Sequence, residues 1–330
     1  MNVRHARFAG DGRIELASSE LPPPAEGEVR VRVAACCICG SDLRVWKSGW
    51  PVTPGHEIAG IVETKGHALF GKRVLVYIPV HCGACPECDA GATNVCRNST
   101  DLMGWQRPGG FAEALNVPAR SLLVIPDDIP LDLAPLLLDT IGTAAHGIRL
   151  AKRVVAGGPA LVLGAGPVGL GTIIALQRLG FGPVDVVEPA EPRRRMAEEF
   201  GARVVDPGAL ADRYPLVIEA SGKDAARQLA LDRVAPLGAV VQLGEAPQWS
   251  VEETKAIRRK DFFYIRSFYF PVSEYEENLA LFRADRDRYA RLVDRRAGLS
   301  GLGELFTGFA RGDRMKPALV FDAAEAEGSK

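Results

Sequence analysis

Two patterns of apolar and polar positions divide the chain. Up to about residue 125, short β-rich runs are separated by proline and glycine. Val29–Val33 alternates apolar and polar residues with a period of two, and Arg73–Ile78 is a second candidate strand. This half of the chain therefore predicts an irregular β domain.

After about residue 140 the pattern changes to short apolar runs separated by helical periodicity. Helical patterns cover residues 170–179 and 193–200, and the candidate strands are residues 160–163, 183–187, 203–205, 215–218 and 239–243. Alternation of this kind predicts an α/β fold with a parallel sheet covered by helices on both faces. The last stretch ends in Ala318–Phe321, a strand expected to return to the first domain.

Composition narrows the class of protein. A chain of 330 residues with 47% hydrophobic and 25% charged residues is typical of a soluble globular protein with two domains. The net charge of -1 gives no electrostatic reason to expect a nucleic-acid or membrane partner. The start lacks the apolar core of a signal peptide, and glycines and a proline interrupt the least polar stretch, Ala160–Leu176. We expect a cytoplasmic protein.

Four cysteines lie close together in one loop. Cys82, Cys85, Cys88 and Cys96 are separated by two, two and seven residues. Such spacing suits a closed, all-sulfur structural zinc site. The alternatives are two disulfides or four unrelated thiols, and disulfides are disfavoured because nothing else in the chain looks secreted. The loop predicts a zinc that holds structure and performs no chemistry.

A glycine-rich string follows the strand at 160–163 and opens a helix. It reads Gly164-Ala165-Gly166-Pro167-Val168-Gly169, and Glu188 ends the next expected strand. Such a turn cradles a dinucleotide pyrophosphate at the helix N-terminus, and the acidic residue accepts the ribose hydroxyls. Glu188 therefore favours NAD, unless it is only a solvated carboxylate at a strand end. Arg193–Arg195 leave NADP open, although these arginines also suit a solvated helix face.

A second candidate metal site lies in the first domain. Cys39 and His56 offer a thiolate and an imidazole, a pair that zinc binds, and Asp42 is suited to orient the ring of His56. Each residue alone is more often structural. Cys36 and Cys37 are expected to be a buried strand pair.

Together these motifs carry a resemblance. The chain resembles the zinc-dependent medium-chain dehydrogenases, the alcohol, polyol and threonine dehydrogenase group, over nearly all its length. Further matching pieces are Gly109–Glu113 and Val217–Gly222. The resemblance implies a GroES-like catalytic domain formed by residues 1–140, with the zinc loop 82–96, and by residues 270–330. A Rossmann NAD-binding domain at 141–269 would lie between them.

The resemblance also implies roles for individual residues. Cys39 and His56 would ligate a catalytic zinc, Glu57 would be able to approach it, and Asp139 falls on the third ligand position. Ethanol-type enzymes have cysteine there, so the carboxylate favours a polyol, cyclitol or amino-alcohol substrate. The remaining assignments from the resemblance are Ser41 as proton acceptor and Thr143 and Val168 beside the nicotinamide. Arg193 is a further cofactor-binding candidate, which would contact a 2′-phosphate if the cofactor is NADP.

The implied reaction is a reversible, NAD-linked oxidation of a secondary alcohol to a ketone, with one catalytic and one structural zinc. The expected partner is a small-molecule alcohol or ketone. The protein itself is expected to form a homodimer or homotetramer. The alternatives are an NADPH-dependent carbonyl reductase and a non-catalytic zinc- and nucleotide-binding protein.

Four further residues bear on the expected active site. Arg44 stands where the family often has a histidine at the outer end of a proton relay. Trp46 and Trp50 either wall the pocket or are ordinary aromatics. His146 is expected to be packed or hydrogen-bonded, and not a ligand.

Overall fold

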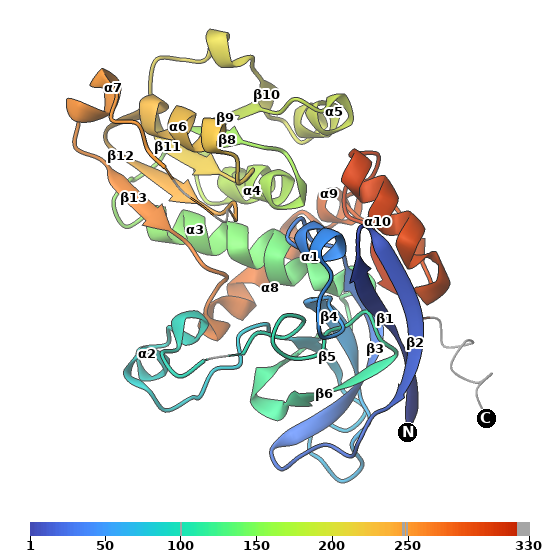
Figure 1. Ribbon diagram of the computed structural model, residues 1–330. Helices are drawn as coiled ribbons and strands as arrows, with labels where there is room; N and C mark the ends of the chain where they lie inside the picture. The colour runs from blue at the N-terminus through green and yellow to red at the C-terminus, as the bar shows by residue number, and fades with distance from the viewer. Residues whose placement is uncertain (100, 246–247, 249, 322–330) are drawn as a thin grey trace. The chain divides into compact units, whose positions relative to one another are not determined.

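The computed structural model describes residues 1–99, 101–245, 248 and 250–321. The chain forms two compact units (Figure 1). The first contains residues 1–138, 271–273 and those from 290 onward, and the second contains residues 139–270 and 274–289.

The first unit is rich in β-structure. Its elements are β1 (Asn2–Gly10), β2 (Arg13–Glu20), β3 (Glu28–Cys37), α1 (Asp42–Ser48), β4 (Glu57–Val62), β5 (Arg73–Val76), α2 (Pro86–Asp89), β6 (Ala114–Pro118), β7 (Leu122–Val124), β14 (Arg296–Ala297), α10 (Leu302–Arg311) and β15 (Ala318–Val320). β1 and β2 form an antiparallel hairpin. The larger sheet has the order β14-β15-β3-β4-β5-β7, and β6 also pairs with β3.

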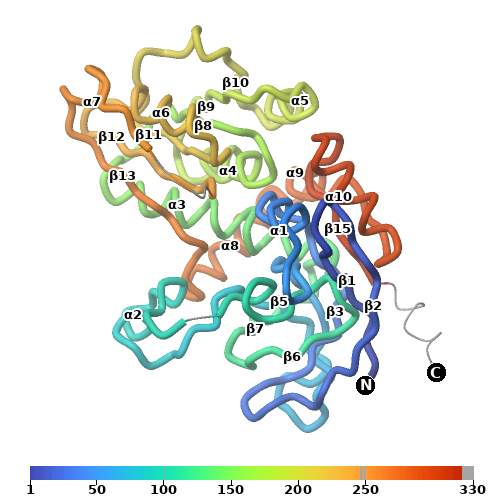
Figure 2. The backbone as a smooth tube through the Cα atoms, viewed as in Figure 1, coloured from blue at the N-terminus to red at the C-terminus, as the bar shows by residue number. Residues whose placement is uncertain are grey.

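Strand β3 is the centre of this sheet, because it pairs with β4, β6 and β15. Its alternating residues Val29, Val31 and Val33 are fully buried, as the period of two predicts. Phe8 and Phe306 add aromatic packing at 5.1 Å between ring centroids, so α10 closes the core that the sheet begins. Figure 2 shows the path by which the red C-terminal segment returns to the blue N-terminal strands.

The second unit alternates strands and helices. Its elements are α3 (Ala144–Ala151), β8 (Gly158–Leu163), α4 (Pro167–Arg178), β9 (Phe181–Val187), α5 (Glu191–Glu199), β10 (Arg203–Val204), β11 (Tyr214–Glu219), α6 (Asp224–Arg233), β12 (Val234–Gln242), α7 (Lys255–Arg258), β13 (Phe263–Arg266), α8 (Tyr275–Ala284) and α9 (Arg286–Ala290), which ends at the boundary. Every pair of neighbouring strands in its six-stranded sheet is parallel.

The strand order β10-β9-β8-β11-β12-β13 reverses direction at β8. This is the order of a doubly wound dinucleotide-binding sheet. Right-handed crossovers then place α4 and α5 on one face of the sheet and α6 on the other. The predicted α/β class, with a β-rich domain and a Rossmann sheet, is confirmed.

Apart from shifts of one or two residues at the other boundaries, the division differs from the expected one in a single stretch. Residues 274–289 belong to the second unit and not to the returning segment 270–330. The carboxylate of Asp285 pairs with Arg178 of α4, and Glu274 contacts His146 and Arg149 of α3. These contacts hold α8 to the nucleotide unit. Residues 322–330 of the expected segment lie outside the described residues.

No helix among the described residues combines the length and the apolar character that crossing a membrane requires.

Candidate active site

The four loop cysteines converge. One sulfur from each of Cys82, Cys85, Cys88 and Cys96 lies within 4.8 Å of the others. The backbone N–H of Ala84 donates to Sγ of Cys82 at 3.4 Å, and this is the largest of several hydrogen bonds that together lower the pKa of the thiol to about 6. A thiolate is the form that zinc binds. The donor set and its spacing fit a structural zinc ion, which remains a prediction.

A second group of donors surrounds Cys39 and His56. Asp42, the first residue of α1, accepts the N–H of Cys39 at 2.8 Å through Oδ2, and its Oδ1 lies 3.1 Å from Nδ1 of His56. Asp42 and His56 are both buried. One carboxylate therefore fixes the backbone of Cys39 and the ring of His56, and Nε2 of His56 is the nitrogen suited to bind a metal.

Glu57 belongs to the same group and is fully buried. Its Oε1 forms an ion pair with Nζ of Lys316, which is also fully buried, across a separation of 259 residues. Asp294 accepts the backbone N–H groups of Met315 at 3.0 Å and Lys316 at 3.3 Å, which fixes the segment before β15. The pairing of β15 with β3 thus brings a lysine beside the candidate metal site. The sequence patterns did not indicate this residue.

Asp139 supplies the fourth donor. One ligand atom from each of Cys39, His56, Glu57 and Asp139 lies within 4.8 Å of the others. A thiolate, an imidazole and two carboxylates at this spacing fit a zinc ion. Asp139 directly follows Leu138 in a π-helical segment, Leu138–Thr143, a geometry that often occurs at functional sites.

The π-helical segment lies against α4. A Cβ on Gly171 would lie 2.3 Å from the carbonyl oxygen of Thr140, so only glycine permits this approach. Thr143, the residue expected beside the nicotinamide, ends the same segment. The segment that carries Asp139 is therefore packed on the helix that the glycine-rich turn opens.

The glycine-rich turn has the geometry that a dinucleotide requires. Gly164 has φ +95°, and a Cβ there would lie 2.8 Å from Cβ of Ser221. A Cβ on Gly169 would lie 2.0 Å from the oxygen of Gly164, whereas a Cβ on Gly166 would meet nothing within 4 Å. The space beside Gly166 is thus open in front of α4, which begins with Pro167 and Val168. This is where a pyrophosphate is expected.

Glu188 is tied to this turn. Its Oε2 accepts the N–H of Ala165 at 2.7 Å, and its Oε1 accepts the N–H of Ala190 at 2.9 Å. The carboxylate is therefore fixed at the end of β9, and it is only 6% exposed.

The three following arginines differ from one another. Arg194 and Arg195 both pair with Glu191, as a solvated helix face would. Nε of Arg193 is buried and makes no hydrogen bond within the described part of the chain.

A tryptophan that the sequence analysis did not single out contacts the candidate metal site. The ring centroids of Trp105 and His56 are 5.5 Å apart, and the guanidinium of Arg44 lies 5.2 Å from the centroid of Trp105. Trp50 supports Trp105 by donating its Nε1–H to the carbonyl of Trp105 at 2.8 Å. Trp46 instead packs against Phe306 in the core. The feature of the sequence that could have indicated Trp105 is its position shortly before Gly109–Gly110, which belong to a segment that matches the family resemblance.

The other candidates are structural. Nδ1 of His146 lies 2.8 Å from Oε1 of Glu274, so His146 is hydrogen-bonded and does not belong to the metal group. Cys36 and Cys37 are buried in β3, and burial raises the pKa of both thiols.

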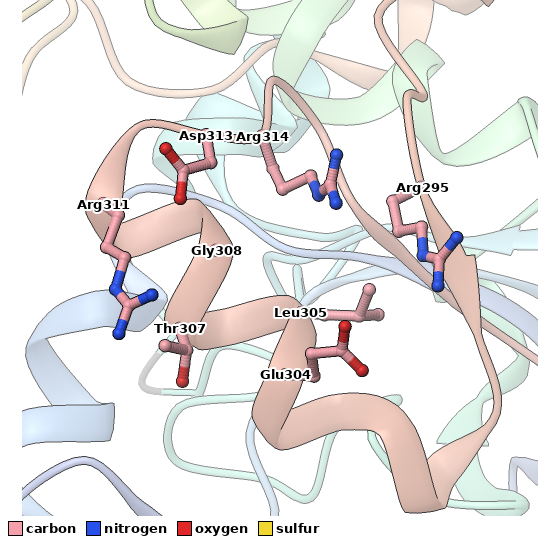
Figure 3. A pocket seen from close by; sticks show the side chains of 8 residues that line it. All are labelled: Arg295, Glu304, Leu305, Thr307, Gly308, Arg311, Asp313 and Arg314. Atoms are coloured by element: carbon pink, nitrogen blue, oxygen red, sulfur yellow. The ribbon is translucent and has the colours of Figure 1, made fainter.

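Figure 3 shows a cavity of about 170 Å³ beside α10 in the first unit. The side chains of Arg295 and Arg314 border one side of it, and Glu304 lies below them. None of its lining residues belongs to either group of metal donors or to the glycine-rich turn.

The fold and the donor groups define a class of protein: a two-domain oxidoreductase that combines a dinucleotide-binding domain with a GroES-like domain. Residues 25–127 match the family model of the alcohol dehydrogenase GroES-like domain. The chain is 33% identical to 2-dehydro-3-deoxy-L-galactonate 5-dehydrogenase of Pseudoalteromonas atlantica over 61% of each protein. It is 34% identical to L-threonine 3-dehydrogenase of Pyrococcus furiosus, over 71% of this chain and 73% of that protein.

A solved structure of a similar protein supports the same family. A candidate zinc-binding dehydrogenase of Sinorhizobium meliloti 1021, bound to NADP, superposes with a TM-score of 0.83 at 27% identity, covering 97% of this chain and 100% of the other. The chain belongs to the zinc-dependent medium-chain dehydrogenase family. It is an alcohol oxidoreductase of that family.

Proposed function

We propose that this protein catalyses the reversible NAD-linked oxidation of a secondary alcohol, a polyol, cyclitol or amino alcohol, to a ketone. The observation that carries the proposal is the donor group in which Asp139 joins Cys39, His56 and Glu57. A carboxylate in place of a second thiolate suits a site that accepts a substrate with two neighbouring polar groups. The similarity to an L-threonine dehydrogenase supports an amino-alcohol or polyol substrate.

The roles of the residues follow from their positions. A zinc ion held by Cys39, His56 and Asp139, with Glu57 in reach, would polarise the substrate hydroxyl, and NAD would accept the hydride. Asp42 holds the ring of His56 and the backbone of Cys39, so the two donors keep their geometry through turnover. Ser41, directly before α1, takes the hydroxyl proton.

The direct test is a panel of sugar alcohols, inositols and amino alcohols assayed with NAD by the fluorescence of NADH. Oxidation of a member of the panel supports the proposal. No turnover with any alcohol would favour a zinc- and nucleotide-binding protein without catalysis. Size-exclusion chromatography tests the expected homodimer or homotetramer.

The second candidate is an NADPH-dependent carbonyl reductase. The buried Nε of Arg193 favours it, since an arginine at this edge of the sheet could meet a 2′-phosphate. The NADP-bound structural relative also supports it.

Glu188→Ala should raise KM for NAD by about tenfold to hundredfold, since a carboxylate that accepts charge-assisted hydrogen bonds contributes about 1.5–3 kcal/mol. The difference between the KM values for NAD and NADP should narrow, because the negative charge near the ribose is lost. Initial rates with both cofactors measure this change. Glu198→Ala, an exposed carboxylate on α5, is the control and should leave both values unchanged. A native preference for NADP would contradict the assignment and make Arg193 a phosphate ligand.

Asp139→Asn should weaken zinc retention and lower turnover by about 10–100-fold while leaving NAD binding intact. The amide keeps the shape of the side chain but removes its charge. Zinc content after dialysis and NADH formation measure the two losses. Asp127→Asn removes an exposed carboxylate and serves as the matched control. Unchanged turnover in Asp139→Asn would remove the case for a polyol-like substrate.

A further inference from the structure

The cavity beside α10 gathers charged side chains. Three of its lining residues are cations, Arg295, Arg311 and Arg314, and two are carboxylates, Glu304 and Asp313. Within the described part of the chain, the side chains of these five residues form no ion pair or hydrogen bond. The cavity therefore carries an excess of positive charge, and the described residues leave its guanidinium donors free for a ligand.

The backbone places two of these arginines next to each other. Asp294, the residue before Arg295, accepts the N–H groups of Met315 at 3.0 Å and Lys316 at 3.3 Å, directly after Arg314. These hydrogen bonds hold the two segments together, and both guanidinium groups border the same side of the cavity (Figure 3). Because the carboxylate of Asp294 is engaged by backbone donors, it does not neutralise the arginines.

Helix α10 supplies the opposite side of the cavity. A Cβ on Gly308 would lie 3.1 Å from Cγ of Arg314, so the stem of this half-buried arginine lies against the helix at Gly308. Glu304 is one helical turn earlier on α10 and lies below Arg295 and Arg314 (Figure 3). The cavity thus has two planar cations on one side and a carboxylate on the other.

The charged groups limit what the cavity can bind. Guanidinium groups stay protonated at ordinary pH, and their planar donors match the oxygens of a phosphate. An ionised carboxylate only accepts hydrogen bonds, so an anion beside Glu304 must bring an O–H donor of its own. Hydrogen phosphate carries such a donor at neutral pH, whereas sulfate does not. The cavity of about 170 Å³ is also far larger than a single water molecule needs.

We propose that this cavity is a binding site for hydrogen phosphate, or for a phosphate ester with a hydroxyl beside the phosphate. Arg295 and Arg314 donate to the phosphate oxygens, and Glu304 accepts the O–H group. Arg311, which lines the cavity from the end of α10, adds to the positive charge. No lining residue belongs to the metal donor groups or to the glycine-rich turn, so the site does not depend on the proposed alcohol oxidation.

Isothermal titration calorimetry at neutral pH and constant ionic strength tests the site, with inorganic phosphate and sulfate as the probes. The native protein should bind phosphate about tenfold more tightly than sulfate, because sulfate leaves the carboxylate without a donor. Arg295→Gln and Arg314→Gln should each weaken phosphate binding by about tenfold to hundredfold. Glu304→Gln should reduce the preference over sulfate, since an amide can donate as well as accept.

Arg296→Gln is the matched control. Arg296 directly follows Arg295, but its guanidinium pairs with Asp132 and does not line the cavity. This variant loses the same charge and should keep the native affinity for phosphate. An equal loss of affinity in Arg296→Gln would overturn the proposal, because net charge would then explain the binding. Native affinity in both Arg295→Gln and Arg314→Gln would overturn it as well, because phosphate would then bind elsewhere on the protein.

Two further outcomes complete the test. Equal affinities of the native protein for phosphate and sulfate would overturn the role of Glu304 and with it the proposed ligand. Glycerol 3-phosphate distinguishes the two sources of the phosphate group: tighter binding of the ester, lost in Arg314→Gln, would indicate a phosphorylated metabolite, and tighter binding of inorganic phosphate would indicate the free ion. Phosphate binding that requires both arginines would support the site even if no alcohol were oxidised. Alcohol oxidation without phosphate binding would support the proposed function and overturn the site.

Discussion

Chelation should remove zinc from this protein in two separate steps. The Cys39–His56 group would leave a position open for substrate and should lose its metal first, together with turnover. The Cys82–Cys96 loop would close four sulfurs around a zinc ion and should retain it, since structural zinc sites carry on the order of 10 kcal/mol of apparent binding energy. Metal analysis and activity, followed together during dialysis against a chelator, measure both steps.

Substitution of one loop cysteine tests the second step directly. Cys85→Ser should release the retained zinc and unfold the loop. Cys37→Ala removes a buried thiol outside the quartet, so the zinc content of this control should not change. A single tightly held zinc, with activity that resists the chelator, would contradict the prediction of two sites.

Lys316→Met should lower the free energy of unfolding by about 3–5 kcal/mol. The substitution leaves Glu57 fully buried without the ammonium group that it contacts, and an uncompensated buried charge is far more costly than a lost surface pair. Urea unfolding of protein without metal in the Cys39–His56 group measures the change, because a zinc ion there would itself offset the charge of Glu57.

Two further variants test whether the loss of stability in Lys316→Met comes from the buried ion pair. Arg296→Met breaks the half-exposed pair with Asp132 in the same unit and should cost only about 0–1 kcal/mol. The double variant Lys316→Met with Glu57→Leu should recover much of the stability, because both charges are then gone. Equal costs for Lys316→Met and Arg296→Met would show that the buried pair has no special role.

The elements of the nucleotide unit could be predicted because local patterns determine them. Short apolar runs predicted the strands β8 to β12, with ends within a few residues of the observed ones. The glycine-rich string carries its own backbone requirements, as the positive φ of Gly164 illustrates. The elements of the second unit could therefore be predicted from residues that lie close together in the sequence.

Lys316 and Trp105 could not be predicted in this way. Lysine is almost never fully buried, and Lys316 is buried only because β15 pairs with β3 far away in the sequence. The contact of Trp105 with His56 depends on the close approach of Gly104 to Gly55. The placement of α8 with the nucleotide unit depends in the same way on long-range ion pairs, such as Arg178 with Asp285.

The pairing of β15 with β3 has a consequence for biosynthesis. The ribosome delivers β3 before residues 139–289 and β15 after them. Domains generally fold as units during synthesis, so the nucleotide unit can fold while the first unit still lacks β15 and Lys316. Until those residues appear, the nascent chain exposes an edge of β3 and leaves Glu57 without its lysine. This interval is when we expect the polypeptide to depend most on chaperones.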